Sequence, residues 1–268
     1  MIQPQLTIIF LLNHNAMNKF SFFSVMTIVL ATLGVSCSKS DDVVSPAAAH
    51  WDYENPNWQT EGYTECTGMI QSPIDIQTAS TIKANLPNLT FSYTAFPIKI
   101  IDNGHTLQVN NNGANSVTYN GKMYAFKQFH FHYHSEHLLD GVAGDMELHL
   151  VHQDATSGAL LVVAYFLKKG AVSPFFESVL SNWPTELEKE VITTTSVNLT
   201  SIVPADQRYY SYVGSLTTPP CSQGVTFFIL KSPLEVSSSQ LDQFKAHYDH
   251  NFRPAQPLNS RLVYEDIQ

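Results

Sequence analysis

The sequence predicts one mainly β domain, and three observations support that fold class. Aromatic residues make up 12% of the 268 residues, and the chain contains 12 glycines and 14 prolines. Segments in which apolar and polar residues alternate outnumber segments with helical spacing, and Asn, Gly or Pro bounds most of them, as is typical of strands joined by turns. Neither an internal repeat nor a long low-complexity linker divides the chain, so we expect a single domain.

The N-terminal residues differ in composition from the rest and predict a secretory signal. Residues 18–36 read NKFSFFSVMTIVLATLGVS, with one lysine before an apolar run that is short for a membrane span and is closely followed by small residues. The residues before Met17 contain no positive region, so Met17 is an alternative start to Met1. We expect a signal peptide over residues 1–36.

Cys37 follows the segment LGVS at residues 33–36, which resembles the cleavage box of bacterial lipoproteins, although Gly34 stands where a large apolar residue is usual. We therefore expect residues 37–49 to form a polar tether that is lipidated at Cys37, with a plainly secreted protein as the alternative. Either form would be exported to the periplasm or cell envelope, and the lipidated form would be an outer-membrane lipoprotein. The lipid would be its one contact with a membrane.

The two remaining cysteines indicate the compartment in which the protein acts, and the net charge indicates which partners it can bind. Cys66 and Cys221 form an even pair in a protein that we expect to be exported, and disulfides persist outside the cytoplasm, so we predict that the two are bonded. Closing so long a loop would stabilise the folded chain by roughly 4–5 kcal/mol. The formal net charge of −9 and the lack of clustered Lys and Arg argue against nucleic acid as a partner.

In chain order, the domain begins with an irregular segment and continues as short strands. Residues 50–76 are dense in aromatic residues, Gly and Pro without sustained periodicity, and we expect Trp51, Tyr53 and Trp58 to anchor them. A strong turn signal, NNNG, occupies residues 110–113. Alternating segments that predict strands lie at residues 89–93, 98–102, 106–110 and 116–120.

The second half of the chain contains a longer apolar run and the two best helix candidates. Residues 159–169, ALLVVAYFLKK, are continuously apolar over the length of a strand, which predicts a strand deep in the sheet. We expect helices at residues 174–183, with Pro174 in the first turn, and at residues 237–249, with Ser237 as the N-terminal cap. The domain should span residues 50–268.

Six of the eleven histidines lie between residues 128 and 152, in the stretch QFHFHYHSEHLLDGVAGDMELHLVH. His130 and His132 are two residues apart in an alternating segment, so a strand would place both imidazoles on one face. His149 would share a face with Glu147 in a second alternating segment, MELHLVH. If the two strands are neighbours, three imidazoles converge, and three neutral nitrogen ligands with an open fourth position are typical of a catalytic zinc site.

A second interpretation treats the same stretch as the metal site of a cupin. The spacing His130-x-His132-x-x-x-Glu136 is similar to the first cupin motif, in which two His and a Glu hold iron, manganese or zinc. Glu136 would then be a direct metal ligand. Against this interpretation, Tyr124 stands where a glycine is expected, and the later segments SLTTPP and RPAQP have no explanation.

Seven motifs in one order favour the zinc interpretation. From about His50 to Arg261, the chain resembles the α-class carbonic anhydrases in the segments QSPIDI, DNGH, QFHFH, SEH, ELHLVH, YYSYVGSLTTPPCSQGVTF and NFRPAQPLNSR. The resemblance implies a large, twisted, mostly antiparallel sheet of about ten strands with a few short peripheral helices. It also implies an exported bacterial lyase, carbonate dehydratase, that converts carbon dioxide reversibly to bicarbonate and a proton.

The resemblance assigns the metal ligands and the residues that orient them. It implies that Zn²⁺ is bound by His130, His132 and His149 and that a zinc-bound hydroxide attacks carbon dioxide, the chemistry established for this family. Each imidazole needs its second ring nitrogen held by a partner. The matching partners are Gln128, Glu147 and the backbone carbonyl of Asn251.

Further roles follow from the same resemblance. Thr217, in SLTTPP, matches the residue whose hydroxyl accepts a hydrogen bond from the hydroxide and donates one to Glu136. His105, in DNGH, matches the proton shuttle, since an imidazole that titrates near neutrality can carry a proton to bulk water. Tyr53, Asn103 and Gln108 match the residues that order the water chain. The expected substrate wall consists of Val151, Val162, Leu216, Thr217, Thr218 and Val225.

Three positions depart from the family pattern. Phe227 and Phe252 stand where tryptophan is common, and His134 stands where Gly or Pro is common. We expect the three remaining histidines of the stretch, His134, His137 and His152, to be bystanders, with a competing metal contact as the alternative for His134. Two alternatives to a carbonic anhydrase stay open: a cupin-like metal oxygenase or isomerase, and a non-catalytic carbonic anhydrase-like binding domain, against which the three intact histidines count.

Overall fold

The computed structural model describes residues 50–111 and 114–268. The expected signal peptide, the alternative start at Met17, the tether and its lipidation site Cys37 lie outside these residues, as do the last two residues of the NNNG segment. Among the described residues, no helix combines the length and the apolar character needed to cross a membrane.

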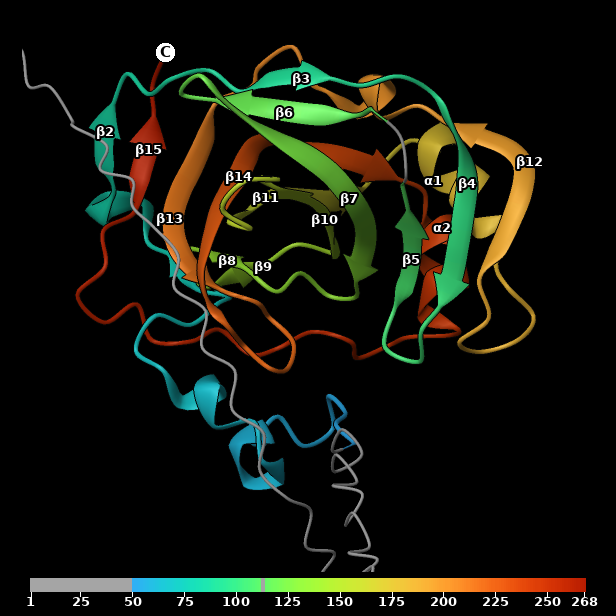
Figure 1. Cartoon of the computed structure of the whole chain (residues 1–268), viewed down its shortest axis with the longest axis horizontal. Helices are drawn as coiled ribbons and strands as arrows, with labels where there is room; N and C mark the ends of the chain where they lie inside the picture. Colours follow the sequence, from blue (N-terminus) through green and yellow to red (C-terminus); the bar gives the residue numbers. More distant parts are fainter. Residues whose placement is uncertain (1–49, 112–113) are drawn as a thin grey trace, which may run out of the picture. The chain divides into compact units, whose positions relative to one another are not determined.

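One large mixed sheet forms the body of the described chain (Figure 1). Its twelve strands are β2 (Ile82–Ala84), β3 (Thr90–Ser92), β4 (Phe96–Asp102), β5 (Leu107–Asn110), β6 (Ser116–Tyr119), β7 (Lys122–His132), β10 (Met146–Gln153), β11 (Leu160–Lys169), β12 (Val191–Val197), β13 (Tyr209–Ser215), β14 (Gln223–Val236) and β15 (Tyr264–Asp266). Ten of them lie in the order β12-β4-β5-β7-β10-β11-β14-β13-β15-β2. Because β6 also pairs with β7 and β3 pairs with β6, the sheet has twelve strands rather than about ten.

A smaller sheet contains β1 (Asp75–Ile76), β8 (Leu138–Leu139) and β9 (Val142–Ala143). In the large sheet most strand pairs are antiparallel, as expected, whereas the small sheet has one parallel and one antiparallel pair. Among the described residues, the parallel pairs are β1 with β8, β11 with β14, and β15 with β2. The mainly β fold class is therefore confirmed.

The strands expected from alternation form, but the NNNG segment does not close a hairpin. It lies between β5 and β6, and each of these strands pairs with β7 instead of with the other. The continuously apolar run at 159–169 is β11, which lies between β10 and β14. Its central residues are buried on both faces, and this explains why they do not alternate.

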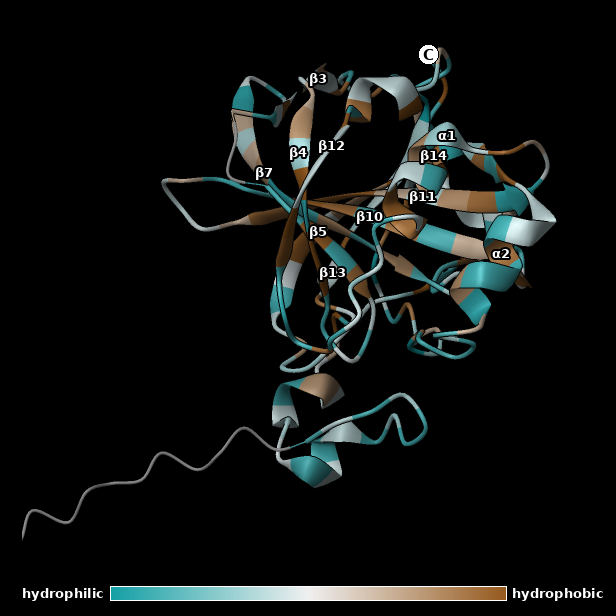
Figure 2. Cartoon of the chain, turned by 90° about the vertical axis from the view of Figure 1, so that its right-hand side faces the viewer, coloured by the Kyte–Doolittle hydropathy of each residue, from teal (hydrophilic) through white to brown (hydrophobic). Residues whose placement is uncertain are grey.

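Two buried apolar clusters occupy opposite faces of the central strands. Along β11, Val163 and Tyr165 belong to the larger cluster, whereas Val162 and Ala164 belong to the smaller one. Figure 2 shows hydrophobic residues along strands near the centre of the sheet, such as β11. Consecutive residues of these strands therefore face opposite clusters. The same alternation places the histidines and the phenylalanines of β7 on separate faces of the sheet.

Helices α1 (Pro174–Leu180) and α2 (Ser238–Lys245) cover the face of the larger cluster. The Phe131 ring of β7 lies 4.8 Å from the Phe176 ring of α1 and 6.0 Å from the Phe244 ring of α2, measured between centroids. Ser237 begins α2 with a capping box, as its sequence predicts. Both helices end three or four residues earlier than expected, and the residues that follow them form turns.

The N-terminal segment is anchored where the sequence predicts. It contains two short 3-10 helices, Trp58–Glu61 and Thr64–Thr67. Tyr53 and Trp58 form a third apolar cluster with Cys66 and Cys221, and Trp51 packs against it. The predicted disulfide between the two cysteines is present, with an S–S distance of 2.00 Å.

Candidate metal centre

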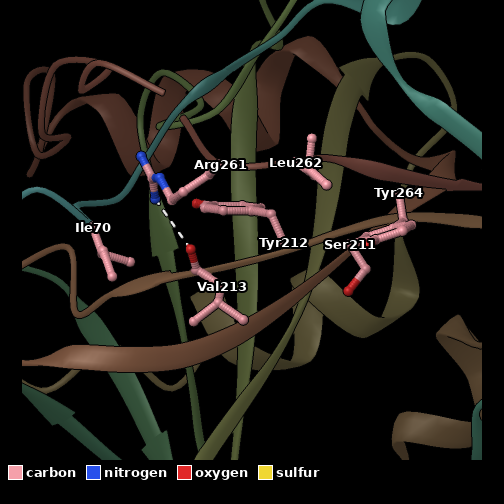
Figure 3. Close-up of a pocket in the computed structure, with 7 residues that line it drawn as sticks. All are labelled: Ile70, Ser211, Tyr212, Val213, Arg261, Leu262 and Tyr264. Atoms are coloured by element: carbon pink, nitrogen blue, oxygen red, sulfur yellow. Dashed lines mark hydrogen bonds between the residues drawn. The ribbon is translucent and has the colours of Figure 1, made fainter. Parts of the chain in front are cut away.

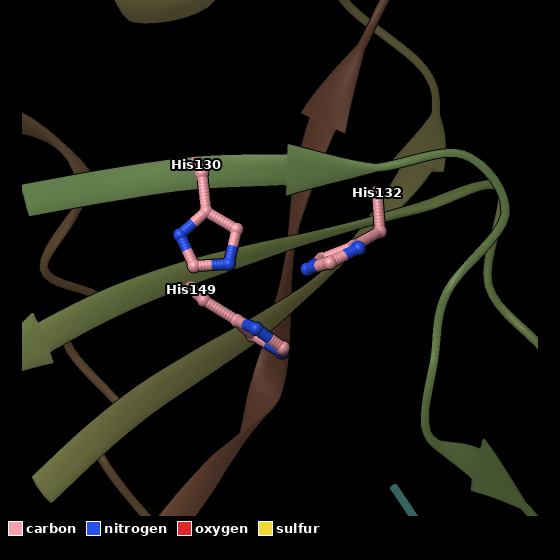
Figure 4. A group of neighbouring side chains, drawn as sticks. All are labelled: His130, His132 and His149. Atoms are coloured by element: carbon pink, nitrogen blue, oxygen red, sulfur yellow. The ribbon is translucent and has the colours of Figure 1, made fainter. Parts of the chain in front are cut away.

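Three imidazoles from two adjacent strands converge on one face of the large sheet (Figure 4). In the antiparallel pair of β7 and β10, His130 lies directly opposite His149, and His132 lies opposite Glu147. The ring centroids of His130, His132 and His149 are 4.7–5.3 Å apart. One ring nitrogen from each lies within 4.8 Å of the other two, which is a spacing that a single metal ion can bridge.

The outward nitrogens of the two β7 histidines are held by different partners. His130 Nδ1 donates to Gln128 Oε1 at 2.8 Å, and His132 Nδ1 donates to the Asn251 backbone oxygen at 2.7 Å. Each bond fixes the tautomer and the ring plane, and leaves Nε2 of both histidines facing the cluster. Gln128 is two residues from its partner, whereas Asn251 comes from a segment that follows α2.

His149, the candidate ligand on β10, is oriented by the Glu147 carboxylate, and His137 in turn orients that carboxylate. Glu147 Oε1 accepts from His149 Nε2 at 2.7 Å and from His137 Nδ1 at 2.6 Å, and Glu147 Oε2 accepts from the His137 backbone N–H at 2.8 Å. Burial opposes ionisation of Glu147, but the two histidines outweigh burial and hold the pKa of Glu147 well below its ordinary value. His149 Nδ1 is therefore the nitrogen that faces the cluster.

The expectation that His137 is a bystander is wrong. His137 is fully buried, and its Nε2 lies 2.7 Å from the Tyr212 hydroxyl. Because His137 Nδ1 carries the hydrogen that it donates to Glu147 in a hydrogen bond, Nε2 of the neutral ring is an acceptor and the Tyr212 hydroxyl donates to it. The side chains of His137, Glu147 and His149 could also hold a metal by spacing alone. Their mutual hydrogen bonds account for that spacing without an ion.

The electrostatics of the cluster fit a metal ligand set. Burial lowers the pKa of His130 and His149, and lowers that of His132 to about 4, so all three imidazoles are neutral at physiological pH, as ligation requires. His132 Nε2 is buried and has no hydrogen-bond partner among the described residues. An unpaired buried nitrogen is costly, and a cation at the centre of the cluster would satisfy it. Three imidazoles with an open position are a donor set that zinc accepts.

Glu136 lies beside the cluster without joining the ligand set. Its Oε1 accepts from the Arg253 backbone N–H at 2.9 Å, and its Oε2 lies 3.4 Å from His132 Nε2. Burial raises the pKa of Glu136 to about 7, while His149, the Arg253 amide and the Thr217 side chain act in the opposite direction. Among the described residues, Glu136 belongs to neither group whose spacing could hold a metal, in contrast to the cupin interpretation.

His105 lies in the turn that joins β4 to β5. Its ring stacks on Trp51, with centroids 3.7 Å apart and an interplanar angle of 8°, and lies 6.4 Å from the Tyr53 ring. Burial and then the nearby His50 lower the pKa of His105, whereas Asp52 and Glu188 oppose them. The structure thus brings Tyr53 and His105 together.

The two other residues expected along the water chain make contacts within the protein. Asn103 Oδ1 accepts the N–H groups of His105 at 3.0 Å and Thr106 at 2.9 Å, so this side chain shapes the turn. Gln108 is paired in register with His130, and its Nε2 donates to Asn110 Oδ1 at 2.6 Å.

The apolar residues expected around the substrate lie together. Val162 and Val225 belong to the smaller buried cluster, and Val151 and Leu216 pack against it. Thr217 and Thr218 follow in the loop after β13, where Cys221 N donates to the Thr218 oxygen at 2.9 Å. The disulfide ties this loop to the N-terminal segment.

Two of the remaining histidines lie apart from the cluster. His134 is exposed beside Phe252. His152 is buried, and its Nε2 lies 2.9 Å from the Tyr93 hydroxyl oxygen.

A surface pocket of about 390 Å³ also lies apart from the cluster and contains none of the three candidate ligands (Figure 3). It is lined by Ile70, Ser211, Tyr212, Val213, Arg261, Leu262 and Tyr264.

Comparisons with known proteins agree with this geometry. The family model described as eukaryotic-type carbonic anhydrase matches residues 53–267. A carbonic anhydrase of Klebsiella pneumoniae is 41% identical over 233 residues, covering 83% of this chain and 93% of the relative, and one of a Nostoc species is 36% identical, covering 89% and 94%. The α-carbonic anhydrase of Thermovibrio ammonificans, solved with the inhibitor sulfanilamide, has a TM-score of 0.78 at 38% identity and covers 81% of this chain and 100% of its own.

Proposed function

The chain belongs to the eukaryotic-type carbonic anhydrase family and is a carbonic anhydrase, a lyase, and on this premise we propose that it hydrates carbon dioxide reversibly with zinc bound by His130, His132 and His149. One observation carries the proposal: three neutral imidazoles, two buried and one half-buried, point one ring nitrogen each at a common centre, and the opposite nitrogen of each is hydrogen-bonded. Such a set leaves a position open for water.

The zinc ion, when bound, would supply Lewis acidity that makes hydroxide available near neutral pH, as is established for carbonic anhydrases. The protein's own part would be to keep the three imidazoles neutral and oriented. Gln128, Glu147 and the Asn251 carbonyl would do so, since each already accepts a hydrogen bond from the N–H group of one of the rings. Glu147 differs from the other two because it adds a negative charge.

Thr217 and Glu136 would orient the nucleophile. An ionised carboxylate only accepts hydrogen bonds, so a Thr217 hydroxyl that donates to Glu136 must use its own oxygen to accept from the nucleophile. Without a cation, burial raises the pKa of Glu136 to about 7, and a nearby positive charge would lower it again, favouring the ionised form that this role requires.

Carbon dioxide would be placed by apolar side chains, and the proton would leave through His105. The half-buried or buried residues Val151, Val162, Leu216 and Val225 offer an apolar wall beside the histidine face, with Thr217 and Thr218 at its loop edge. His105 would accept a proton through water and release it to solvent. Tyr53 lies beside it, while Asn103 and Gln108 would line the same route with polar groups.

Metal analysis of the purified protein together with stopped-flow carbon dioxide hydration tests the proposal. We expect one zinc per chain, and hydration that chelation abolishes and added zinc restores. Stoichiometric zinc without hydration would refute the enzymatic function. Iron bound through a carboxylate would instead support the cupin alternative, although among the described residues Glu136 belongs to neither group whose spacing could hold a metal.

We also propose that the protein acts outside the cytoplasm, exported by residues 1–36 and anchored by a lipid on Cys37. The Cys66–Cys221 disulfide supports export, because such bonds persist in oxidising compartments. Mass spectrometry of the mature N-terminus in the wild type and in the Cys37→Ser variant tests it. A diacylated Cys37 and membrane release of the variant are expected, whereas an unmodified N-terminus would refute the anchor.

A further inference from the structure

Asp102 is a buried carboxylate immediately before the Asn103-Gly104-His105 turn, with an exposed fraction of 5%. Three donors converge on its two oxygens. Oδ2 accepts from Trp183 Nε1 at 2.9 Å, while Oδ1 accepts from the Gly104 N–H at 3.2 Å and from the Tyr248 hydroxyl. Neither the resemblance nor the motifs assign any role to these contacts.

The side-chain donors come from distant segments. Trp183 follows α1 and Tyr248 follows α2, and the Trp183 ring packs 5.6 Å from the Phe244 ring and stacks on His247 at 3.9 Å. The backbone also takes part, since the Asp102 oxygen accepts from Glu188 N at 2.7 Å. Asp102 thereby connects the turn to the packed helical layer behind the sheet.

The turn holds His105 through its backbone. Asn251 Nδ2 donates to the His105 oxygen at 3.1 Å, and the imidazole itself contacts Trp51. We propose that Asp102 is a positioning residue for proton transfer: by binding Trp183, Tyr248 and Gly104 at once, it fixes the turn that presents His105. This inference rests on the proposed shuttle role of His105.

The chemistry requires a carboxylate, because both oxygens must accept. An asparagine has almost the same shape but one acceptor atom, so its NH₂ group would face either the Trp183 N–H or the donors at Oδ1. A donor opposed to a donor in a buried site is unfavourable, and the turn would move to relieve it. Asp102→Asn is therefore a change in hydrogen bonding with little change in volume.

A displaced turn should affect one kinetic constant more than the other. Proton release to solvent limits kcat when buffer is weak, whereas kcat/KM reports the conversion of carbon dioxide to bicarbonate. A general loss of structure would lower both. The two constants therefore separate a positioning role from a structural one.

The test is stopped-flow hydration by the zinc-loaded, full-length D102N variant in weak buffer, with and without imidazole. We expect kcat to fall about three- to tenfold and to be restored by imidazole, while kcat/KM stays within about twofold of the wild type. The matched control is D154N, because Asp154 is also a buried aspartate that accepts N–H groups of the following turn, from Thr156 and Ser157, but lies outside the candidate site. Its two constants should not separate.

An unchanged kcat in weak buffer, or a parallel loss of kcat and kcat/KM, would overturn the inference. If D102N does not fold, Trp183→Phe and Tyr248→Phe each remove one donor and should show the same separation with a smaller amplitude. His105→Ala in the same buffers separates the proposed shuttle role of His105 from the proposed positioning role of Asp102. A normal His105→Ala enzyme would refute the shuttle and the inference together, whereas an impaired one beside a normal D102N would refute the inference alone.

Discussion

The metal centre and the His105 turn are positioned in different ways. The three histidines lie on neighbouring strands of the central sheet, and two of them are oriented by a residue two positions away, Gln128 for His130 and Glu147 for His149. The His105 turn depends instead on side chains from beyond both helices, through Asp102. The comparison teaches that the candidate ligands are placed by strand geometry, with His132 alone oriented from a distant segment through Asn251, whereas the proposed proton exit is fixed by tertiary packing.

The largest effect should come from removing a ligand. His132→Ala deletes one of three candidate ligand nitrogens and leaves only two to hold zinc, so we expect zinc to be lost and hydration to fall by about a thousandfold or more. Zinc content after dialysis and stopped-flow rates are the measurements. His105→Ala is the control, since it should keep its zinc. A His105→Ala protein without zinc would show that metal binding depends on the His105 turn as well as on the three histidines.

A smaller effect is expected from the charge that orients His149. Glu147→Gln keeps the shape but replaces an acceptor pair by one oxygen and one NH₂ group, which opposes a donating histidine. Zinc affinity, measured by competition with a chelator, should weaken by about 10- to 100-fold. Gln128→Leu removes an uncharged acceptor and should weaken it less. Equal losses would mean that the negative charge adds nothing to orientation.

The shuttle should matter for turnover and not for the metal. His105→Ala removes the proposed proton carrier while the strands and the candidate ligands stay in place, so kcat in weak buffer should fall by about 10- to 30-fold and recover with imidazole. Zinc stoichiometry should stay at one per chain. Protons would have to leave by another route if imidazole gave no recovery in a variant that had lost activity.

The smallest effect on the candidate metal centre is expected from His152. This residue lies on β10, as His149 does, but its side chain contacts Tyr93 and not the three candidate ligands. Burial lowers the pKa of His152 to about 3. The folded state therefore binds the His152 proton more weakly than the unfolded state, so its contribution to stability is complete above pH about 6.5 and is lost as pH falls toward 3. His152→Gln should reduce the slope of unfolding free energy against pH by about 1.4 kcal/mol per pH unit near pH 5.

Urea unfolding at several pH values measures that slope, and zinc content should be unchanged in the variant. An identical slope in the wild type and His152→Gln would show that the histidine is already protonated in the folded protein. Burial on β10 would then not suffice to keep an imidazole neutral.

The two regions also differ in how far sequence alone could predict them. Alternation in QFHFH and MELHLVH places His130, His132 and His149 on the correct faces, and the strands predicted around them form. The same reasoning assigns His137 to the bystanders, because its partners Glu147 and Tyr212 lie 10 and 75 positions away. Periodicity describes one strand and contains no information about which side chains meet across a sheet.

Asp102 shows the same limit more strongly. Before an Asn-Gly pair, an aspartate indicates a turn and nothing further. Its partners Trp183 and Tyr248 meet it only because α1 and α2 pack on the sheet and end where they do, and the predicted helix ends were themselves too late. The parallel pairing of β11 with β14 was likewise absent from the prediction, since an apolar run does not reveal its neighbour.

The disulfide makes one part of the chain a closed covalent ring. Cys66 and Cys221 are 155 positions apart, and the three candidate ligands, Glu136, Thr217 and His105 all lie between them. A protease that cuts once inside this ring, for example at the exposed turn around residue 156, would leave both pieces joined through sulfur. Asn251 and Arg253 lie outside the ring, so a cut after residue 221 would leave them held by hydrogen bonds and packing alone.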